Sequence, residues 1–212
     1  MAVFRTLELF AGTQSFTKGV KRLYPAGQAQ ALTVDILPKF KPTFVADMLE
    51  WDYTIFPPEH FDIIWCSPPC TEYSSAKSRG VRDLEYADRL VKRCFEILDY
   101  YKPKAWIMEN PATGLLPGRI ATIRPGIPAP VIGDYCAYGA SYRKRTAFWS
   151  NKPLALRQCQ KDKCESMGTD GRHKAIIGGT SRRPGQTEVR NVWARDTIPP
   201  TLIDALITQL II

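Results

Sequence analysis

Cys70 is the residue whose position in the sequence best suits nucleophilic chemistry. It follows two consecutive prolines at the end of the apolar run 61–66, and prolines stiffen the backbone that carries it. Lys77, Arg79 and a helix N-terminus come soon after, and positive charge lowers the pKa of a thiol and favours the reactive thiolate. We predict that Cys70 is a nucleophile, whereas an inert, buried thiol is the expectation for Cys66, Cys94 and Cys136.

Glu109 is the second candidate, because it ends an apolar run and precedes an Asn-Pro pair. A carboxyl group in partly apolar surroundings has a raised pKa and can carry a proton at neutral pH, as a general acid requires. The segment 142–146 adds Arg143 and Arg145, which share one face at strand spacing and point toward this site or toward phosphate.

A glycine turn and two acidic residues, each after an apolar run, are together typical of a site for an adenosyl cofactor. Gly12 lets the backbone approach a ligand closely, and the helix N-terminus that follows favours negative charge. Asp35 suits the two hydroxyls of a ribose, and Asp47 can accept a hydrogen bond from an adenine amino group. The predicted cofactor-binding residues are Phe10, Ala11, Gly12, Thr13, Asp35, Ile36, Asp47, Met48 and Pro68.

The elements that must position these residues alternate between strands and helices. Apolar runs predict strands over 3–9, 29–36, 43–46, 61–66 and 104–108. Helical periodicity is clearest over 83–101, and an earlier helix opens at Ser15 or Thr17. Such alternation predicts an α/β fold: a mostly parallel sheet with helices on both faces. Ligands bind at the carboxyl ends of these strands, so the candidate residues should meet at one rim.

The pattern becomes less regular after residue 111. Residues 114–130 are rich in Gly and Pro and are predicted to be a loop, whereas 131–138 and 146–150 are predicted strands that could be antiparallel. A basic, loop-rich stretch follows, and two prolines then open a helix over 201–212. We expect a main domain at 1–150, a small basic region at 151–195 and a C-terminal segment, 196–212, whose helix returns to the main domain.

Charge is unevenly distributed along this chain, whose formal net charge is +8. Residues 1–140 hold 16 basic and 15 acidic side chains, whereas residues 141–195 hold 13 basic and 4 acidic ones. A concentrated surplus favours a polyanionic partner, although a basic surface kept for solubility is the alternative. No apolar run has the length of a membrane span and no signal peptide is evident, so we expect a soluble intracellular protein without a membrane partner.

Six cysteines at irregular spacing indicate free or functional thiols rather than disulfides in a chain without an export signal. Cys159, Cys164 and His173 could bind zinc with a fourth ligand such as Cys136. Their spacings are loose for a zinc site, and only three local ligands are evident. Our prediction therefore contains no metal, and zinc stays open as the alternative.

In five segments the sequence resembles the cytosine-C5 DNA methyltransferase family, and the segments occur in the family's order. They resemble its cofactor loop, its Pro-Cys nucleophile loop, its Glu-Asn-Val segment, its Arg-x-Arg segment and its C-terminal Val-Pro-Pro helix. In this chain the segments are Leu9-Phe10-Ala11-Gly12, Cys66–Ser74, Glu109-Asn110-Pro111, Arg143-Lys144-Arg145 and Ile198–Leu202.

The resemblance implies a Rossmann-like methyltransferase fold, S-adenosylmethionine as cofactor and duplex DNA as partner. Cys70 would add to C6 of a flipped-out cytosine, and Glu109 would protonate N3. Arg145 would bind the base O2, with Arg143 supporting it, and loss of the C5 proton would follow methyl transfer. Residues 151–195 would be the target-recognition region, short enough to imply a short or relaxed recognition sequence. Nucleic-acid contacts are expected at Ser74, Lys77, Arg79, Lys144, Arg182 and Arg183.

Several residues depart from the family's pattern, although none of them is a reacting group. Thr71 stands where Gln is usual, Pro111 where Val is usual and Ser141 where Gln is usual, while Gln14 and Ser15 replace glycines of the cofactor loop. We therefore expect a small, divergent, phage-like member. It would act as a monomer in the cytoplasm of a bacterial or phage-infected cell, in restriction-modification or phage DNA modification.

Three alternatives stay open. The same chemistry could act on RNA, or the transferred group could differ from plain methyl. The chain could also be a catalytically inactive nucleic-acid-binding or regulatory protein on the same fold. The intact set of reacting groups argues against the inactive form, since an inactive copy is expected to lose one of them; the set is Cys70, Glu109, Arg143 and Arg145.

Overall fold

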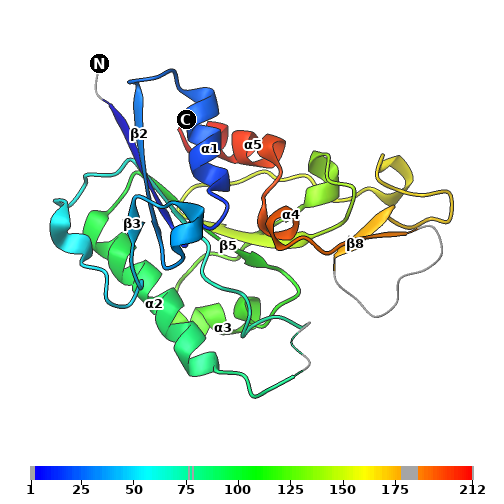
Figure 1. Ribbon diagram of the computed structural model, residues 1–212, viewed down its shortest axis with the longest axis horizontal. Coiled ribbons are helices and arrows are strands. Elements are labelled where there is room, and N and C mark those ends of the chain that lie inside the picture. Colours follow the sequence, from blue (N-terminus) through cyan, green and yellow to red (C-terminus); the bar gives the residue numbers. More distant parts are fainter. Residues whose placement is uncertain (1–2, 76, 78, 178–185, 212) are drawn as a thin grey trace.

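A seven-stranded sheet forms the centre of the computed structural model, which describes residues 3–75, 77, 79–177 and 186–211. Its strands are β1 (Phe4–Leu9), β2 (Ala29–Asp35), β3 (Phe44–Val45), β4 (Ile63–Cys66), β5 (Ala105–Pro111), β6 (Val131–Asp134) and β7 (Arg145–Ser150). Their order is β3-β2-β1-β4-β5-β7-β6, and β7 runs antiparallel to both β5 and β6 while the other pairs are parallel. The predicted α/β class and mostly parallel sheet are confirmed (Figure 1).

Helices cover both faces of this sheet (Figure 1). On one face α1 (Ser15–Leu23) and α5 (Pro200–Leu210) share an apolar cluster with β4, β5 and β7. On the other face α2 (Leu84–Tyr101) and α3 (Leu116–Ile123) enclose the second cluster. The side chains of β4 are buried throughout, which explains why its sequence is an uninterrupted apolar run rather than an alternating one.

The C-terminal helix α5 closes the chain back onto its beginning, as the sequence predicts. Gly19 of α1 lies directly against Ile203 of α5, so closely that a Cβ atom at Gly19 would stand 2.2 Å from Ile203 Cγ2. Arg22 and Asp204 form an ion pair at 2.5 Å, and the Ile198 N–H donates to Ser15 Oγ at 3.1 Å. These contacts place the Ile-Pro-Pro segment beside the loop that follows β1.

Two predictions for the second half of the chain need correction. Residues 114–130 contain α3 rather than only loop, because Leu116 and Ile120 are buried against the core and a proline suits the first turn of a helix. The strand expected over 131–138 ends at Asp134, and a 3₁₀ helix (Tyr135–Tyr138) follows it. The antiparallel pairing of β6 and β7 is confirmed.

The described residues of 151–177 and 186–190, which we call the basic arm, lie at the β6–β7 edge of the sheet and extend sideways from it (Figure 1). Its described parts hold a 3₁₀ helix (Lys161–Lys163) and a parallel pair of strands, β8 (Ala175–Ile177) and β9 (Thr187–Val189). The short helix α4 (Val192–Asp196) then leads back to α5. Across the described residues, no helix has the length and apolar character needed to cross a bilayer.

Candidate active site

The first part of the site is the loop between β1 and α1, which is the predicted cofactor loop. Phe10 and Gly12 have positive φ values of 57° and 45°, so the backbone turns sharply as soon as β1 ends. The Gly12 N–H donates to Asp35 Oδ2 at 2.8 Å, and the Leu37 N–H donates to Asp35 Oδ1 at 2.8 Å. Asp35 is therefore fixed beside the loop, at the rim where the sequence places it.

The other predicted cofactor residues lie along the same end of the sheet but differ in what they offer. Ala11 and Thr13 are buried within the loop, whereas Ile36 exposes 56% of its surface next to Asp35. The half-buried Asp47 accepts the Leu49 N–H through Oδ1 at 2.9 Å. Met48 packs in the core, so its side chain is turned away from the rim.

Gln14 adopts a left-handed conformation (φ 57°) at a position where the family carries glycine. Its side-chain amide donates to the carbonyls of Phe40 at 2.6 Å and Lys41 at 3.1 Å. The bonds to the 40–41 segment tie the cofactor loop to the turn between β2 and β3. Gln14 therefore takes part in the hydrogen bonds that hold this rim together.

Glu8 is a buried charge-bearing residue that the sequence analysis did not identify. Its carboxyl accepts the N–H groups of Phe16 at 3.2 Å and Thr17 at 2.9 Å, which are orphan donors at the start of α1. Burial raises its pKa to about 7, although these bonds partly oppose the shift. A single acid in the strand just before a Gly turn is the only sequence signal that could have indicated this role.

Cys70 lies on the loop after β4 and is half-buried. The loop is fixed to both neighbouring strands, because the Ser67 N–H donates to the Leu9 carbonyl at 3.2 Å and Asn110 Nδ2 donates to the Pro68 carbonyl at 2.9 Å. Burial raises the pKa of the Cys70 thiol, and the Glu109 carboxylate raises it further. This direction is opposite to the sequence prediction.

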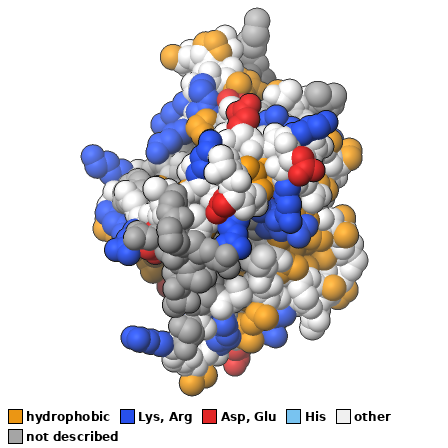
Figure 2. Space-filling model, turned by 90° about the vertical axis from the view of Figure 1, so that its right-hand side faces the viewer, with side chains coloured by type: hydrophobic (Ala, Val, Ile, Leu, Met, Phe, Trp, Pro, Cys, Tyr) orange, Lys and Arg blue, Asp and Glu red, His pale blue; other side chains and the backbone are white. Residues whose placement is uncertain are grey.

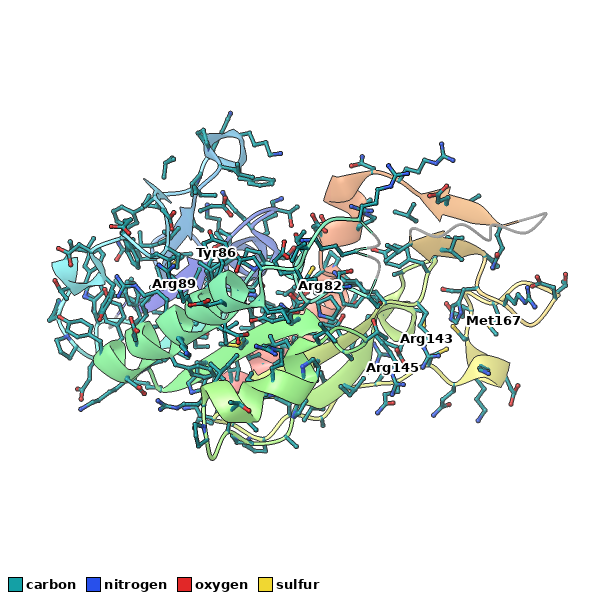
Figure 3. All side chains as sticks on the ribbon, turned by 90° about the horizontal axis from the view of Figure 1, so that it is seen from below. Arg82, Tyr86, Arg89, Arg143, Arg145 and Met167 are labelled. Carbon is teal, nitrogen blue, oxygen red and sulfur yellow. The ribbon has the colours of Figure 1, made fainter. Side chains whose placement is uncertain are left out.

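The cations expected to lower the pKa of Cys70 are not beside it. Lys77 pairs with Glu72 at 2.5 Å and donates to the Val81 carbonyl at 3.0 Å, and Arg79 is exposed. Arg82, which the sequence analysis did not single out, instead donates to the carbonyls of Glu72 at 2.7 Å and Ser74 at 2.8 Å (Figure 3). The loop after Cys70 is thus held by Arg82, and Lys77 serves the same local network.

Glu109 is buried in β5, and burial raises its pKa, as predicted. The charge of the nearby Lys144 ammonium opposes part of that shift. Even so, Glu109 Oε1, Tyr135 OH and Thr146 Oγ1 are buried without a hydrogen-bond partner among the described residues. Buried polar atoms rarely lack partners, so this cluster is what a site for a polar ligand would present.

The charge of the Lys144 ammonium acts on both the candidate nucleophile and the candidate acid. It lowers the pKa of Cys70 and the pKa of Glu109, and so offsets part of the rise that burial causes. This ammonium lies 5.0 Å from the Tyr135 ring centroid and donates to the Arg195 carbonyl at 3.2 Å. The register of β5 and β7 explains this placement, because Phe148 lies directly opposite Glu109 and their side chains point to the same face of the sheet. Side chains two residues apart along a strand share a face, so Thr146 and then Lys144 lie on the face that carries Glu109.

Arg143 and Arg145, the two arginines predicted to be catalytic, lie just before and at the start of β7 (Figure 3). Arg143 pairs with the fully buried Asp134, with Nε 3.0 Å from Oδ1 and Nη2 3.3 Å from Oδ2. Arg145 is exposed at the start of β7, and no described residue bonds to its guanidinium. The expected nucleic-acid contacts Arg182 and Arg183 lie outside the described residues.

The fold and the rim together define the class of this protein. A candidate DNA modification methyltransferase from an Escherichia coli prophage superposes with a TM-score of 0.52 at 16% identity, covering 78% of this chain and 56% of that one. A methyltransferase of Entamoeba histolytica gives 0.54 at 18% identity, covering 76% and 58%. The chain therefore has the Rossmann-like methyltransferase fold, and it spans little more than half the length of these two structures.

Sequence comparison then gives the family. The family of C-5 cytosine-specific DNA methylases matches residues 4–116. A protein of frog virus 3 (isolate Goorha), named "Probable DNA (cytosine-5)-methyltransferase", is 31% identical over 226 residues, covering 96% of this chain and 98% of that protein. This chain belongs to the C-5 cytosine-specific DNA methylase family, whose reaction class is methyl transfer to carbon 5 of cytosine.

Proposed function

We propose that this chain methylates carbon 5 of a cytosine flipped out of duplex DNA, through a covalent bond between Cys70 and C6 of the base. The observation that carries the proposal is the half-buried Cys70 thiol beside the buried Glu109 carboxyl, whose Oε1 has no hydrogen-bond partner among the described residues. A base in a duplex is stacked and paired, so it must leave the helix to meet a thiol at this depth.

Cys70 and Glu109 would work as a proton-coupled pair. The raised pKa of Glu109 favours its protonated form, and loss of the carboxylate charge removes one of the two main causes that raise the pKa of Cys70. The thiolate would then add to C6 while Glu109 protonates N3. Lys144, the cation nearest both groups, would neutralise charge that develops at the base O2.

The remaining steps restore the enzyme. S-adenosylmethionine, when bound, supplies the methyl group that C5 takes. The C5 proton then passes to water, and the electrons of the C5–H bond restore the ring double bond. The C6–sulfur bond breaks with its electron pair leaving on sulfur, and the N3 proton returns to Glu109. Cys70 leaves as the thiolate, ready for another turnover.

The residues at the carboxyl ends of β1, β2 and β3 fit this cofactor. Gly12 supplies the left-handed backbone turn, the fixed Asp35 carboxylate suits the ribose hydroxyls, and exposed Ile36 offers an apolar surface for adenine. The half-buried Asp47 would accept the adenine amino group.

Duplex DNA is the polyanion that the basic arm would contact. Lys and Arg side chains spread over the face that carries the arm, with few acidic ones among them (Figure 2). Exposed Arg145 lies where the arm meets the sheet and is free to reach a phosphate. The short arm leaves room for few base contacts, so we propose a short or relaxed recognition sequence.

The decisive experiment offers methyl-labelled S-adenosylmethionine with duplex DNA, single-stranded DNA or tRNA. We expect label on cytosine of duplex DNA, whereas label on tRNA alone would reassign the substrate. Binding of DNA without transfer to any substrate would contradict the enzymatic proposal. Affinity for DNA should fall steeply with added salt, because the arm's cations release counterions from the phosphates.

The covalent step has its own test, in which 5-fluorocytosine replaces cytosine in the duplex. Fluorine cannot leave as a cation, so the adduct should accumulate as a protein–DNA complex that survives denaturation. Cys70→Ser should abolish both the trapped complex and turnover while retaining cofactor binding. The control variant Cys94→Ala changes a buried thiol of α2 and should retain both the trapped complex and turnover.

A further inference from the structure

Four metal-binding side chains meet where the basic arm joins the sheet. Cys136, Cys159, Cys164 and His173 each offer one ligand atom, and these atoms all lie within 4.8 Å of one another. Cys159 Sγ is 3.4 Å and Cys164 Sγ is 3.6 Å from His173 Nε2. The sequence left zinc open because it showed only three local ligands. In the fold, Cys136 of the 3₁₀ helix after β6 lies beside these three.

These distances match a tetrahedral zinc site. Bonds of about 2.3 Å to sulfur and about 2.0 Å to nitrogen place the ligand atoms roughly 3.5 Å (N to S) and about 3.8 Å (S to S) apart. The two measured sulfur–nitrogen distances bracket the first value. All three thiols are free, and a disulfide would use only two of them and leave His173 without a role.

We propose that Cys136, Cys159, Cys164 and His173 bind one structural zinc ion, which fixes the basic arm to the catalytic sheet. All four coordination positions are filled by the protein, as in closed structural sites, which leaves no place for a reacting water. Soft thiolate ligands with one imidazole favour zinc over the hard ions magnesium and calcium. The three thiols would lose their protons as the ion binds.

The ligands join parts of the chain that backbone hydrogen bonds also link, such as Ala175 N–H to the Ser141 carbonyl and Asp134 N–H to the Arg157 carbonyl, both at 3.2 Å. Cys136 is buried in the 3₁₀ helix after β6, whereas Cys159 and Cys164 flank the 3₁₀ helix of the arm. His173 precedes β8. Among the described residues of the arm, Ala175 is the one fully buried hydrophobic side chain. Further apolar side chains pack only half-buried against the core, so the ion would add to a limited apolar contact; these are Leu154, Leu156, Ile177 and Val189.

A polar shell supports the four ligands. The buried Asp134 accepts the Cys159 N–H through Oδ2 at 2.8 Å and also pairs with Arg143. Three thiolates and a zinc ion carry a net charge of −1, and Arg143 lies close enough to Cys136 and Cys159 to offset it. Arg143 begins the Arg-Lys-Arg segment, so the ion would also fix the backbone that presents Lys144 to the active site.

Metal content of the purified full-length protein is the first test. Elemental analysis should find one zinc per chain, and cobalt(II) exchanged into the site should give the thiolate charge-transfer and tetrahedral ligand-field absorption of a Cys₃His centre. A chain without stoichiometric metal whose six thiols all react in the folded state would overturn the proposal. So would a mass two hydrogens low, because that indicates a disulfide.

Substitutions at the two histidines give a matched comparison. His173→Ala should lose the ion, whereas His173→Cys should keep it and show a stronger charge-transfer band from a fourth thiolate. His60→Ala removes the chain's other histidine, which stacks on Phe56, and should leave the metal in place. Zinc retained by His173→Ala, or lost equally from His60→Ala, would contradict the assignment. If His173→Ala does not fold, the metal contents of His173→Cys and His60→Ala still test the assignment.

Removing the ion with a chelator tests the structural role separately from catalysis. Hydrogen exchange should accelerate across residues 159–177, while β1, β4 and β5 keep their protection. Cofactor binding at the β1 loop should persist. Unchanged exchange in the arm would show that the ion does not hold it.

Discussion

The rim of the sheet and the basic arm are stabilised in different ways. At the rim, every strand that leads to a candidate residue is part of the buried sheet, and hydrogen bonds fix the loops, as between Gly12 and Asp35 or Asn110 and Pro68. The arm has two three-residue strands, and apart from Ala175 its described apolar side chains are at most half-buried against the core. Polar links and the Cys/His cluster hold it instead.

This difference separates chemistry from recognition within one chain. The reacting groups depend on a close-packed sheet, which tolerates little change of volume or position. The arm depends on a few strong links to Asp134 and to the four candidate ligands, so its surface can vary while those links are kept. Substitutions in the rim should therefore change reaction rates, whereas substitutions in the arm's links should change local stability.

Glu109→Gln should have the largest effect, because it removes the acid of the rim while keeping its shape. We expect methyl transfer to fall by about 10²- to 10⁴-fold, the usual contribution of a positioned general acid. The pKa of Glu109 is raised, so the active, protonated form is present below that pKa and is lost as pH rises through it. The wild-type rate should therefore have a descending limb toward high pH, which the variant lacks.

The control for Glu109→Gln is Glu50→Gln, a change at an exposed carboxyl. It should leave both the rate and the pH profile unchanged. Initial rates across the pH range, with cofactor binding measured in parallel, distinguish a lost proton donor from a misfolded rim. A Glu109→Gln enzyme with the full rate would remove the acid from the mechanism.

Asp134→Asn should have the next largest effect, and it acts on the arm. The change breaks a buried ion pair with Arg143 and weakens the acceptor of the Cys159 N–H. We expect the arm to lose about 1–3 kcal/mol of local stability, because Arg143 and the Cys159 N–H lose their charged acceptor. Hydrogen exchange should show the loss in residues 159–177, with the rim's strands unaffected.

Asp99→Asn is the matched control for this ion pair. Asp99 binds Arg124 through both carboxylate oxygens, but both side chains are well exposed. Its removal should cost at most about 1 kcal/mol. Equal losses in the two variants would mean that the Asp134 pair does not hold the arm.

Gly19→Ala tests the packing that closes the rim from behind. A methyl group there meets Ile203 of α5, so we expect overpacking to cost about 1–3 kcal/mol of unfolding free energy. Gly118→Ala makes the same change in α3, where nothing lies within 4 Å of the new Cβ, and should be neutral or stabilising by up to about 1 kcal/mol. Urea unfolding of both variants gives the comparison, and similar stabilities would show that α5 yields easily.

The sequence predicted the rim well because parallel strands leave strong signals. An apolar run such as residues 61–66 must be buried on both faces, and the residue after it must lie at the carboxyl edge. That reasoning places Gly12, Asp35 and Cys70 together without any long-range information. It fails for α3, whose two buried anchors are too few to outweigh a Gly- and Pro-rich composition.

Two kinds of information were absent from the sequence pattern. Charge environments depend on contacts between distant segments, so Lys77 looked like a neighbour of Cys70 although it pairs with Glu72. Likewise, the sequence offered Cys136 as a possible fourth ligand, but only the fold shows that it lies beside the other three. Arg145 was assigned to the active site from the family resemblance, and the sequence could not show which way the side chains of Lys144 and Arg145 point.

The variants Lys144→Met and Arg145→Met test which of the two residues is the cation of the active site. Of the predicted effects, we expect this one to be the smallest. Lys144 lowers the pKa of Cys70, so its removal should raise that pKa and reduce the thiolate fraction at neutral pH by up to about tenfold. The rate of Cys70 alkylation should therefore shift to higher pH in Lys144→Met. Arg145→Met should leave that profile in place and weaken DNA binding instead, with a shallower dependence on salt. An alkylation profile that moves only in Arg145→Met would return the arginine to the active site and make Lys144 the phosphate contact.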